Sequence, residues 1–231
     1  MRKSVIEVKN LTKYFNKSKI LDNISLSVEN GEVFCLLGPN GSGKTTLVNC
    51  LLSLLKPQKG EVQLLNGSAD AKREIGLIME DDGFYRDMSV EKNLQIICLM
   101  KNIDFKVIPG LLEKVLLTGH RKKRVKKLSQ GMRKRLAIAS SLIGDPQLLI
   151  WDEPYNSLDP PGFQFMRDLI SELHSEGKTI FICTHLLDEV KRTATRVGLI
   201  YRGQLKAVYC NNEIEKKFET IDNFFFHHVP V

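Results

Sequence analysis

The chain has 231 residues, of which 42% are apolar and 26% charged, so it is long enough to bury the core of one domain. No apolar run approaches the roughly 18 residues that predict a membrane-spanning helix, and the N-terminus lacks the apolar core of a signal peptide. We therefore expect a soluble protein that stays inside the cell. The five cysteines are far apart and form no Cys-x-x-Cys pair, which favours reduced core thiols over disulfides or a zinc site.

The first part of the chain predicts antiparallel β-structure. Residues Ser4 to Leu11 alternate apolar and polar side chains, as a half-buried strand does. Ile24 to Val28 and Val33 to Leu37 flank Asn30-Gly31, a dipeptide typical of the tight turn in a β-hairpin. We therefore expect a strand followed by a hairpin.

The next segment, Gly38-Pro-Asn-Gly-Ser-Gly-Lys-Thr45, matches the phosphate-binding pattern G-x-x-x-x-G-K-[ST] at every position. An apolar run enters it and helical spacing from Thr46 to Leu55 follows it, which is the context this loop requires. Its glycines let backbone N–H groups reach phosphate oxygens, and the helix directs its positive end at the same anion. An ordinary glycine-rich turn is the alternative, but it explains neither the lysine nor the threonine.

From the loop chemistry we expect Lys44 to reach the β- and γ-phosphates of a nucleoside triphosphate, and the hydroxyl of Thr45 to ligate Mg²⁺. The candidate phosphate-binding residues are Gly38, Pro39, Asn40, Gly41, Ser42, Gly43, Lys44, Thr45 and Thr46.

The middle of the chain predicts helices over Val90 to Met100, Val107 to Leu117 and Gly131 to Leu142. We interpret residues 87–143 as an inserted helical subdomain of a single-domain chain. Residues 1–86 and 144–231 then form a β subdomain together with the core.

A basic run overlaps the last of these helices. Residues Arg121 to Arg135 hold nine of the 34 lysines and arginines and no acidic residue, and this run makes the chain basic, with a net charge of +7. Such a run can attract anionic lipid headgroups or nucleic acid, or it can be a solvated helix end and loop. The sequence leaves these alternatives open.

The second half of the chain predicts α/β organisation. Two short apolar runs, Leu148 to Asp152 and Thr179 to Cys183, are typical of central parallel strands, and a helical pattern from Phe163 to Ser175 separates them. Asp152 ends a strand, where its carboxylate can hold Mg²⁺ or its water shell. Glu153 can orient and deprotonate a water that attacks the γ-phosphate. The alternative is that Asp-Glu-Pro only starts a turn.

The end of the chain gives weaker signals. Val197 to Tyr201 and Gln204 to Tyr209 predict a hairpin around Arg202-Gly203. The aromatic residues of the tail, Phe224 to Val231, either pack on the last helix or help to form a dimer contact. Two adjacent histidines in this tail are too few to predict a metal site.

Together these residues resemble the ATP-binding cassette ATPases, the nucleotide-binding subunits of ABC transporters. The resemblance covers roughly residues 4–210. Beyond the phosphate loop and the strand that ends at Asp152, which match the two Walker motifs, three segments resemble family motifs in the right order. They are the signature Leu128-Ser-Gln-Gly-Met132, the D-loop Asn156-Ser-Leu-Asp159 and the switch histidine in Thr184-His185. The trailing Gly-Met-Arg is similar to cassettes of bacterial drug and antibiotic exporters, whose membrane domains are separate polypeptides.

The resemblance implies an α/β P-loop NTPase (RecA-like) core with an N-terminal antiparallel β subdomain and an inserted helical subdomain. It also implies a head-to-tail homodimer or heterodimer that holds two ATP molecules between the phosphate loop of one subunit and the signature of the other. Ser129 and Gly131, beside Gln130, would then contact the γ-phosphate across the interface, and His185 would hydrogen-bond it. Asp159 would connect the two sites. Without the resemblance, His185 would be an ordinary polar loop residue.

Four positions differ from the family pattern. Phe15 stands where the family has an adenine-stacking tyrosine, with Tyr14 beside it, and a core-facing Phe15 is the alternative. Glu80 replaces the metal-sensing glutamine; its carboxylate can still ligate Mg²⁺ but adds negative charge, so we expect slower or differently regulated turnover. In the signature, Gln130 replaces the usual first glycine and Met132 the usual final glutamine.

The expected function is therefore to bind and hydrolyse ATP on the cytoplasmic face of the cell membrane and so to power a separate transmembrane ABC permease, expected to be an exporter. A soluble cassette ATPase that acts on nucleic acid or the ribosome is the alternative, supported only by the basic run. A small-molecule kinase would leave the residues from Leu128 to His185 unexplained. The transported substrate and its direction depend on the membrane partner.

Overall fold

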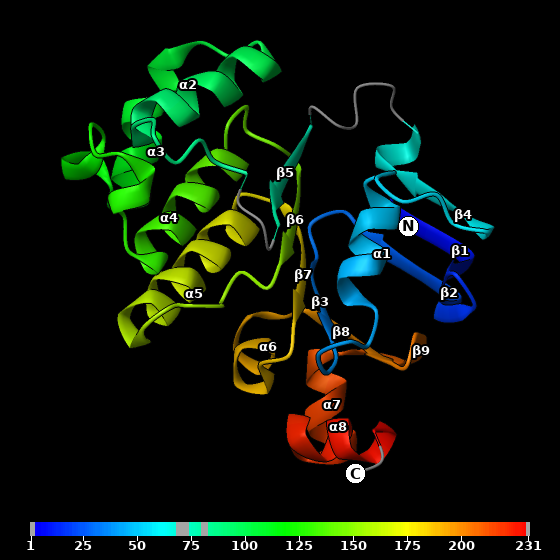
Figure 1. Ribbon diagram of the computed structural model, residues 1–231. Helices are drawn as coiled ribbons and strands as arrows, with labels where there is room; N and C mark the ends of the chain where they lie inside the picture. Colours follow the sequence, from blue (N-terminus) through cyan, green and yellow to red (C-terminus); the bar gives the residue numbers. More distant parts are fainter. Residues whose placement is uncertain (1–2, 68–73, 80–82, 230–231) are drawn as a thin grey trace.

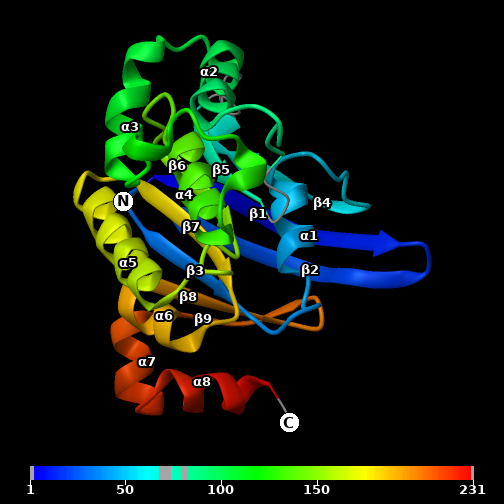
Figure 2. The same ribbon diagram turned by 60° about the vertical axis from the view of Figure 1, so that its left-hand side comes forward.

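The computed structural model describes residues 3–67, 74–79 and 83–229, and it has the expected α/β organisation, with two sheets and flanking helices (Figures 1 and 2). The smaller sheet has the strand order β2-β1-β4, and the larger one β5-β6-β7-β3-β8-β9. Within the described ranges, every helix is too short or too polar to cross a membrane.

The smaller sheet is antiparallel and contains the N-terminal strand that the sequence predicts. Strand β1 (Ser4–Phe15) pairs on one side with β2 (Ser18–Glu29) and on the other with β4 (Lys59–Leu64). The chain turns between β1 and β2 at Asn16, which has a φ of 52°, a left-handed conformation that asparagine tolerates better than most residues. Neither this hairpin nor β4 was predicted from the sequence.

The predicted hairpin between Ile24 to Val28 and Val33 to Leu37 is wrong. Strand β3 (Val33–Leu37) leaves β2 and enters the larger sheet, where it pairs in parallel with β7 and β8. Gly31 does form a turn, with a φ of 78°, but the turn carries the chain from one sheet to the other. The physical reason is burial: all five residues of β3 are buried, so both faces of this strand need a cover, whereas exposed and buried residues alternate in β2 from Asn23 to Val28.

The larger sheet places β3 at its centre. Five strands run parallel and β9 closes one edge as the antiparallel partner of β8, so the predicted central strands and the last hairpin are confirmed. The remaining strands of this sheet are β5 (Ile75–Ile78), β6 (Leu148–Asp152), β7 (Thr179–Thr184), β8 (Arg196–Tyr201) and β9 (Gln204–Cys210).

Helices cover both faces of this sheet, and β3 contributes to two separate cores. Phe34 and Leu36 pack with α1 and the antiparallel sheet, whereas Val33, Cys35 and Leu37 belong to the core beneath α4 and α5. Figure 1 shows α1 on one side of the larger sheet and α4 and α5 on the other. The helices are α1 (Lys44–Leu51), α2 (Val90–Lys101), α3 (Ile108–Lys114), α4 (Gln130–Ser141), α5 (Pro160–Ser175) and α6 (Leu187–Thr193). Short 3-10 turns lie at Leu65–Gly67, Phe105–Val107, Thr118–His120 and Val125–Lys127.

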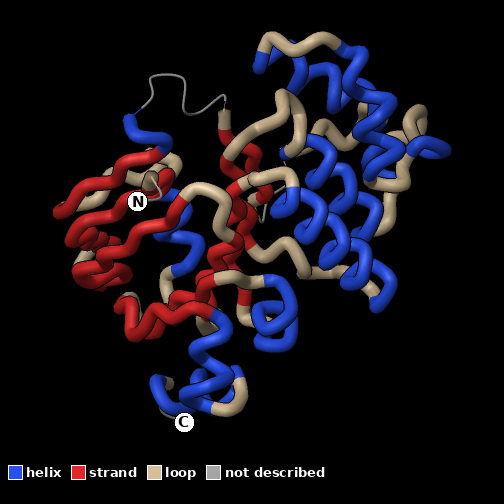
Figure 3. Tube along the Cα trace, turned by 180° about the vertical axis from the view of Figure 1, so that it is seen from behind, coloured by secondary structure: helices blue, strands red, loops and turns tan. Residues whose placement is uncertain are grey.

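The segment 87–143 contains α2, α3 and α4, as the helical patterns predict. Figure 3 shows these helices on the opposite side of the larger sheet from the antiparallel sheet. Helices α1 and α3 end at Leu51 and Lys114, four and three residues before their predicted ends. That this segment forms a subdomain of its own stays a prediction.

The C-terminal tail forms two short helices, α7 (Asn211–Phe218) and α8 (Ile221–His228), that the sequence analysis did not delimit. Phe224 is fully buried, and its ring centroid lies 5.8 Å from that of Tyr209 and 5.4 Å from that of Phe218. The tail is therefore held to β9 by an aromatic cluster. A role in a dimer contact stays untested.

Candidate functional site

The phosphate-binding loop connects β3 to α1, and its conformation requires glycine at two positions. A Cβ at position 38 would lie 2.4 Å from the carbonyl oxygen of Ile200, and Gly43 combines a φ of 109° with a predicted Cβ contact of 2.8 Å to Leu21. Helix α1 then begins at Lys44, with no acidic residue in its first turn. Its positive end is therefore available to an anion.

Lys44 lies over this loop and is only 5% exposed. Its ammonium donates hydrogen bonds to the carbonyl oxygens of Gly38 (2.8 Å) and Pro39 (3.2 Å). It also lies 3.2 Å from Oε1 of Glu153. The lysine thus joins the loop directly to the carboxylate that the sequence identifies as the candidate base.

Thr45 and Asp152 meet although 107 residues separate them. The hydroxyl of Thr45 donates a 2.7 Å hydrogen bond to Oδ2 of Asp152, which is fully buried at the end of β6. Hydroxyl and carboxylate oxygens are ligands that Mg²⁺ prefers, and this ion is commonly bound by one or two protein groups together with substrate phosphates. The pair therefore fits a magnesium ion. In the described part of the chain, no group of three or more His, Cys, Asp or Glu side chains offers another metal site.

Glu153 and His185 complete the cluster. Oε2 of Glu153 lies 3.1 Å from Nδ1 of His185, and the Glu153 side chain is only 12% exposed. Glu153 has a φ of 47°, and its N–H donates to the carbonyl oxygen of Cys183 on β7 (2.9 Å). Because β3, β6 and β7 are parallel neighbours, their carboxyl ends bring Lys44, Glu153 and His185 to the same edge of the sheet.

The signature residues are not part of this cluster. Ser129 caps α4, with its hydroxyl accepting a hydrogen bond from the N–H of Met132 (3.2 Å), and both Ser129 and Gln130 are exposed. Gly131 lies in the first turn of the same helix. These residues form an accessible helix N-terminus that is separate from the chain's own phosphate loop. Their contact with a nucleotide stays a prediction.

Asp159 and the two aromatic candidates also lie outside the cluster. Oδ1 of Asp159 accepts a 2.9 Å hydrogen bond from the N–H of Gly162, so this residue caps α5. Phe15, at the end of β1, is 45% exposed, so the core-facing alternative is wrong, while adenine stacking stays a prediction. Tyr14 is half-buried beside it. Glu80 lies outside the described residues.

Contacts within the chain involve much of the basic run. Arg121 pairs with Glu91 (3.4 Å), and Lys126 pairs with Asp87 (2.5 Å). Arg135 donates to the carbonyl oxygen of Val115, and Arg133 to that of Leu128. These contacts support the structural interpretation of the run, although binding to lipid or nucleic acid is untested.

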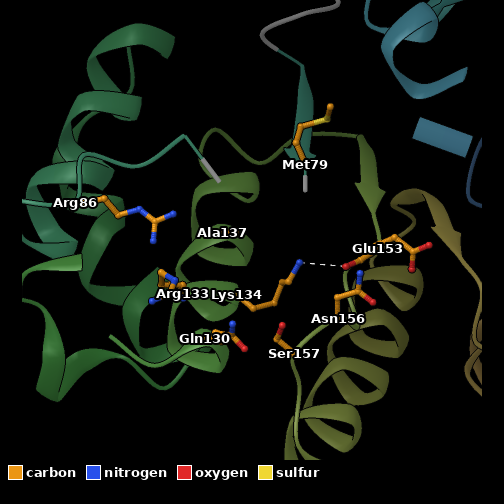
Figure 4. Close-up of a pocket in the computed structure, with 9 residues that line it drawn as sticks. All are labelled: Met79, Arg86, Gln130, Arg133, Lys134, Ala137, Glu153, Asn156 and Ser157. Carbon is orange, nitrogen blue, oxygen red and sulfur yellow. Dashed lines mark hydrogen bonds between the residues drawn. The ribbon is translucent and has the colours of Figure 1, made fainter. Parts of the chain in front are cut away.

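Sequence reasoning did not identify Lys134, which lies at a pocket of about 270 Å³ between α4 and the segment that follows Glu153 (Figure 4). Its ammonium donates to the backbone carbonyl oxygen of Glu153 at 3.1 Å. The only sequence signal for this lysine was its place in the basic run. Every residue has a backbone carbonyl, so a bond to one leaves no pattern of residue types in the sequence. The pocket is lined by Met79, Arg86, Gln130, Arg133, Lys134, Ala137, Glu153, Asn156 and Ser157.

Comparisons with known proteins identify the family of the chain and its fold. Residues 21–156 match the family model described as ABC transporter. The lantibiotic transport ATP-binding protein SrtF of Streptococcus pyogenes is 37% identical over 222 residues, which cover 95% of this chain and 93% of SrtF. The bacitracin transport ATP-binding protein BcrA of Bacillus licheniformis is 39% identical over 209 residues (87% and 68%). A solved ATP-binding subunit of an ABC transporter shares the fold, with a TM-score of 0.87 and 24% identity over 96% of this chain and 98% of that one.

Proposed function

This chain belongs to the ABC transporter family, as an ATP-binding and ATP-hydrolysing subunit that powers a separate transmembrane partner, and from that premise we propose that it drives an exporter of antibiotic-type compounds. The antibiotic transport functions of SrtF and BcrA support this substrate class. The catalytic part of this proposal rests on one observation. Lys44, Glu153 and His185 lie together at one edge of the larger sheet, beside the Thr45–Asp152 pair.

In the proposed mechanism, the loop N–H groups and the N-terminus of α1 bind the phosphates of ATP, and Lys44 adds a positive charge. Thr45 and Asp152 would hold Mg²⁺, which when bound supplies charge that neutralises the phosphate oxygens. Glu153 orients the attacking water and accepts its proton. His185 holds Oε2 of this carboxylate, which leaves Oε1 as the atom that accepts the proton.

Lys44 links nucleotide binding to this base. Its ammonium lies 3.2 Å from Oε1 of Glu153 and so occupies one of the positions from which a water could reach that oxygen. When Lys44 turns towards the phosphates, Oε1 becomes available to the water. The glutamate therefore acts as a base only after the nucleotide has attracted the lysine.

We also propose that the chain works as a dimer, either with itself or with a related cassette. The exposed signature residues Ser129 and Gln130 support this proposal, because they lie on α4 apart from the chain's own phosphate loop. A second copy would bring its phosphate loop to them. The dimer would bind to the cytoplasmic face of the membrane through its permease. The relatives named above are transport ATP-binding proteins, which favours a permease over nucleic acid as the partner.

Two measurements test this function. Calorimetry with the purified chain should detect binding of magnesium ATP, and an absence of binding would overturn the catalytic proposal. Affinity purification from detergent-solubilised membranes should yield a polytopic membrane protein whose export activity needs ATP hydrolysis by this chain. Enrichment of ribosomes or nucleic acid in its place would favour the alternative.

A further inference from the structure

We propose that Lys134 is a positioning residue for Glu153: from helix α4, its ammonium holds the backbone carbonyl of the glutamate and thereby fixes the direction of the carboxylate. The inference rests on the proposed function, because it has Lys134 act through the residue to which we assign the role of base. Lys134 lies outside the family motifs described above, but we expect its loss to lower the rate of ATP hydrolysis.

The backbone of Glu153 is held from two sides. Its N–H donates to the carbonyl oxygen of Cys183 on β7 (2.9 Å), which ties it to the core. Its carbonyl oxygen accepts from the ammonium of Lys134 (3.1 Å) and, more weakly, from the N–H of Asn156 (3.3 Å). Figure 4 shows the Lys134 side chain extended from α4 across the pocket to this carbonyl. The lysine therefore connects α4 directly to the turn that presents the base.

The conformation of Glu153 makes this bond important. Its φ of 47° is left-handed, a region that residues with a Cβ occupy only when their surroundings hold them there. The ring of the next residue, Pro154, fixes the φ of that residue, so the peptide group between the two can turn only together with the ψ of Glu153. The bond from Lys134 to the carbonyl oxygen helps to hold this angle. Without it, the backbone of Glu153 gains freedom to leave its left-handed conformation.

A shift in the backbone of Glu153 would displace the carboxylate from its two partners. Oε1 lies 3.2 Å from Lys44 and Oε2 lies 3.1 Å from His185, so the carboxylate is aligned between two charged or polar groups. General base catalysis depends steeply on such alignment. A lost bond at the backbone of Glu153 should therefore reduce the rate of hydrolysis while the phosphate loop keeps its affinity for ATP.

The position of Lys134 on α4 adds a second consequence. This helix begins with the signature residues, and Lys134 lies just over one turn beyond Gln130, on the same helix. The neighbouring Arg133 makes a different contact, since it donates to the carbonyl oxygen of Leu128 (2.9 Å) and so holds the signature segment itself. We therefore expect a movement of α4 to shift Lys134, and with it the backbone carbonyl of Glu153 in the same chain.

The test compares Lys134→Met, Lys134→Arg and the control Lys122→Met, which removes an exposed lysine of the same basic run. Steady-state ATPase assays give kcat, calorimetry gives the Kd of ATP, and thermal unfolding gives Tm. We expect Lys134→Met to lower kcat roughly tenfold with an unchanged Kd. Lys134→Arg should restore most of the rate, and Lys122→Met should match the wild type. An unchanged kcat in Lys134→Met would overturn the proposal, as would a joint loss of kcat, affinity and Tm, which would show a structural tie only.

A second comparison separates this inference from the proposed function. If Glu153→Gln hydrolyses ATP at the wild-type rate, the role of Glu153 as base is wrong, whatever Lys134 does. If Glu153→Gln is inactive while Lys134→Met is fully active, only the present inference is wrong. Adding Lys134→Met to Glu153→Gln should not reduce the residual rate further, because both changes act through one group. A further tenfold loss in the double variant would contradict the assignment.

Discussion

Nδ1 of His185 lies 3.1 Å from Oε2 of Glu153, although 32 residues separate the two in sequence. The contact arises because β6 and β7 are adjacent parallel strands, so that the residues after their carboxyl ends become neighbours. Lys44 approaches the other carboxylate oxygen at 3.2 Å. One carboxylate is therefore held between a histidine and the lysine of the phosphate loop, an arrangement that supports the proposed role of Glu153 as the base.

Replacing Glu153 by glutamine should nearly abolish ATP hydrolysis while ATP still binds. The amide keeps the shape of the side chain but cannot accept a proton, and loss of a general base lowers a rate by roughly 10²-fold or more. Phosphate release and calorimetry measure the two effects. Glu113→Gln, which alters an exposed glutamate on α3, is the matched control and should behave as the wild type. Full turnover by Glu153→Gln would remove this residue from the mechanism.

Replacing Lys44 by methionine should weaken ATP binding itself. The change keeps the length of the side chain but removes the ammonium that we propose binds the phosphates. A hydrogen bond to a charged group contributes about 1.5–3 kcal/mol, which corresponds to roughly 10- to 100-fold in Kd. Calorimetry with magnesium ATP measures this loss. The exposed Lys59→Met serves as the control. If Lys44→Met binds ATP as the wild type does and loses only kcat, the lysine does not contribute to ground-state binding.

The features predicted correctly from the sequence are those with a local signal. The loop from Gly38 to Thr45 follows from residue types at fixed spacing, and β6 from an unbroken apolar run. The sequence did not show which sheet β3 joins, because Asn30-Gly31 forms a turn in either case. Strand β4 was missed because its side chains are mostly exposed and show little apolar alternation.

The candidate site was predictable to the same extent. Asp152 and Glu153 were proposed because carboxylates follow an apolar strand, whereas His185 was proposed only through the resemblance to the family's switch histidine. The bond from Lys134 to Glu153 was not predictable, because its acceptor is a backbone carbonyl and its geometry depends on how α4 packs against the core.

Cysteine reactivity provides a test of the fold. Cys35, Cys50, Cys98 and Cys183 are buried, and burial raises the pKa of the Cys35 thiol to about 12 and that of Cys183 well above its usual value. At pH 8.5 both buried thiols therefore stay protonated and unreactive, since the thiolate is the nucleophile. Only Cys210 is exposed, although burial by its neighbours raises its pKa as well.

Iodoacetamide at pH 8.5 should therefore add one group to the native chain, at Cys210, and five to the chain unfolded in guanidinium chloride. Intact mass and peptide mapping measure the additions, and Cys210→Ser should show none in the native state. Rapid native labelling at Cys35 or Cys183 would contradict the packing of β3 and β7 at the centre of the larger sheet.

Replacing Phe15 by alanine should weaken binding of ATP but not of inorganic tripolyphosphate. The ring is 45% exposed at the end of β1, and the ammonium of Lys13 lies 5.4 Å from its centroid, so the aromatic face is close to the surface and already near a cation. Aromatic stacking contributes about 0.5–1.5 kcal/mol, which predicts a roughly 2- to 12-fold increase in the Kd of ATP.

Tripolyphosphate has no purine and should bind equally to the wild type and to Phe15→Ala. Phe15→Tyr should keep the wild-type affinity, because stacking needs only the ring, and Phe226→Ala, which removes an exposed phenylalanine of α8, is the control. Equal losses for ATP and tripolyphosphate would show that Phe15 supports the loop rather than the adenine, and an unchanged ATP affinity would exclude stacking at this position.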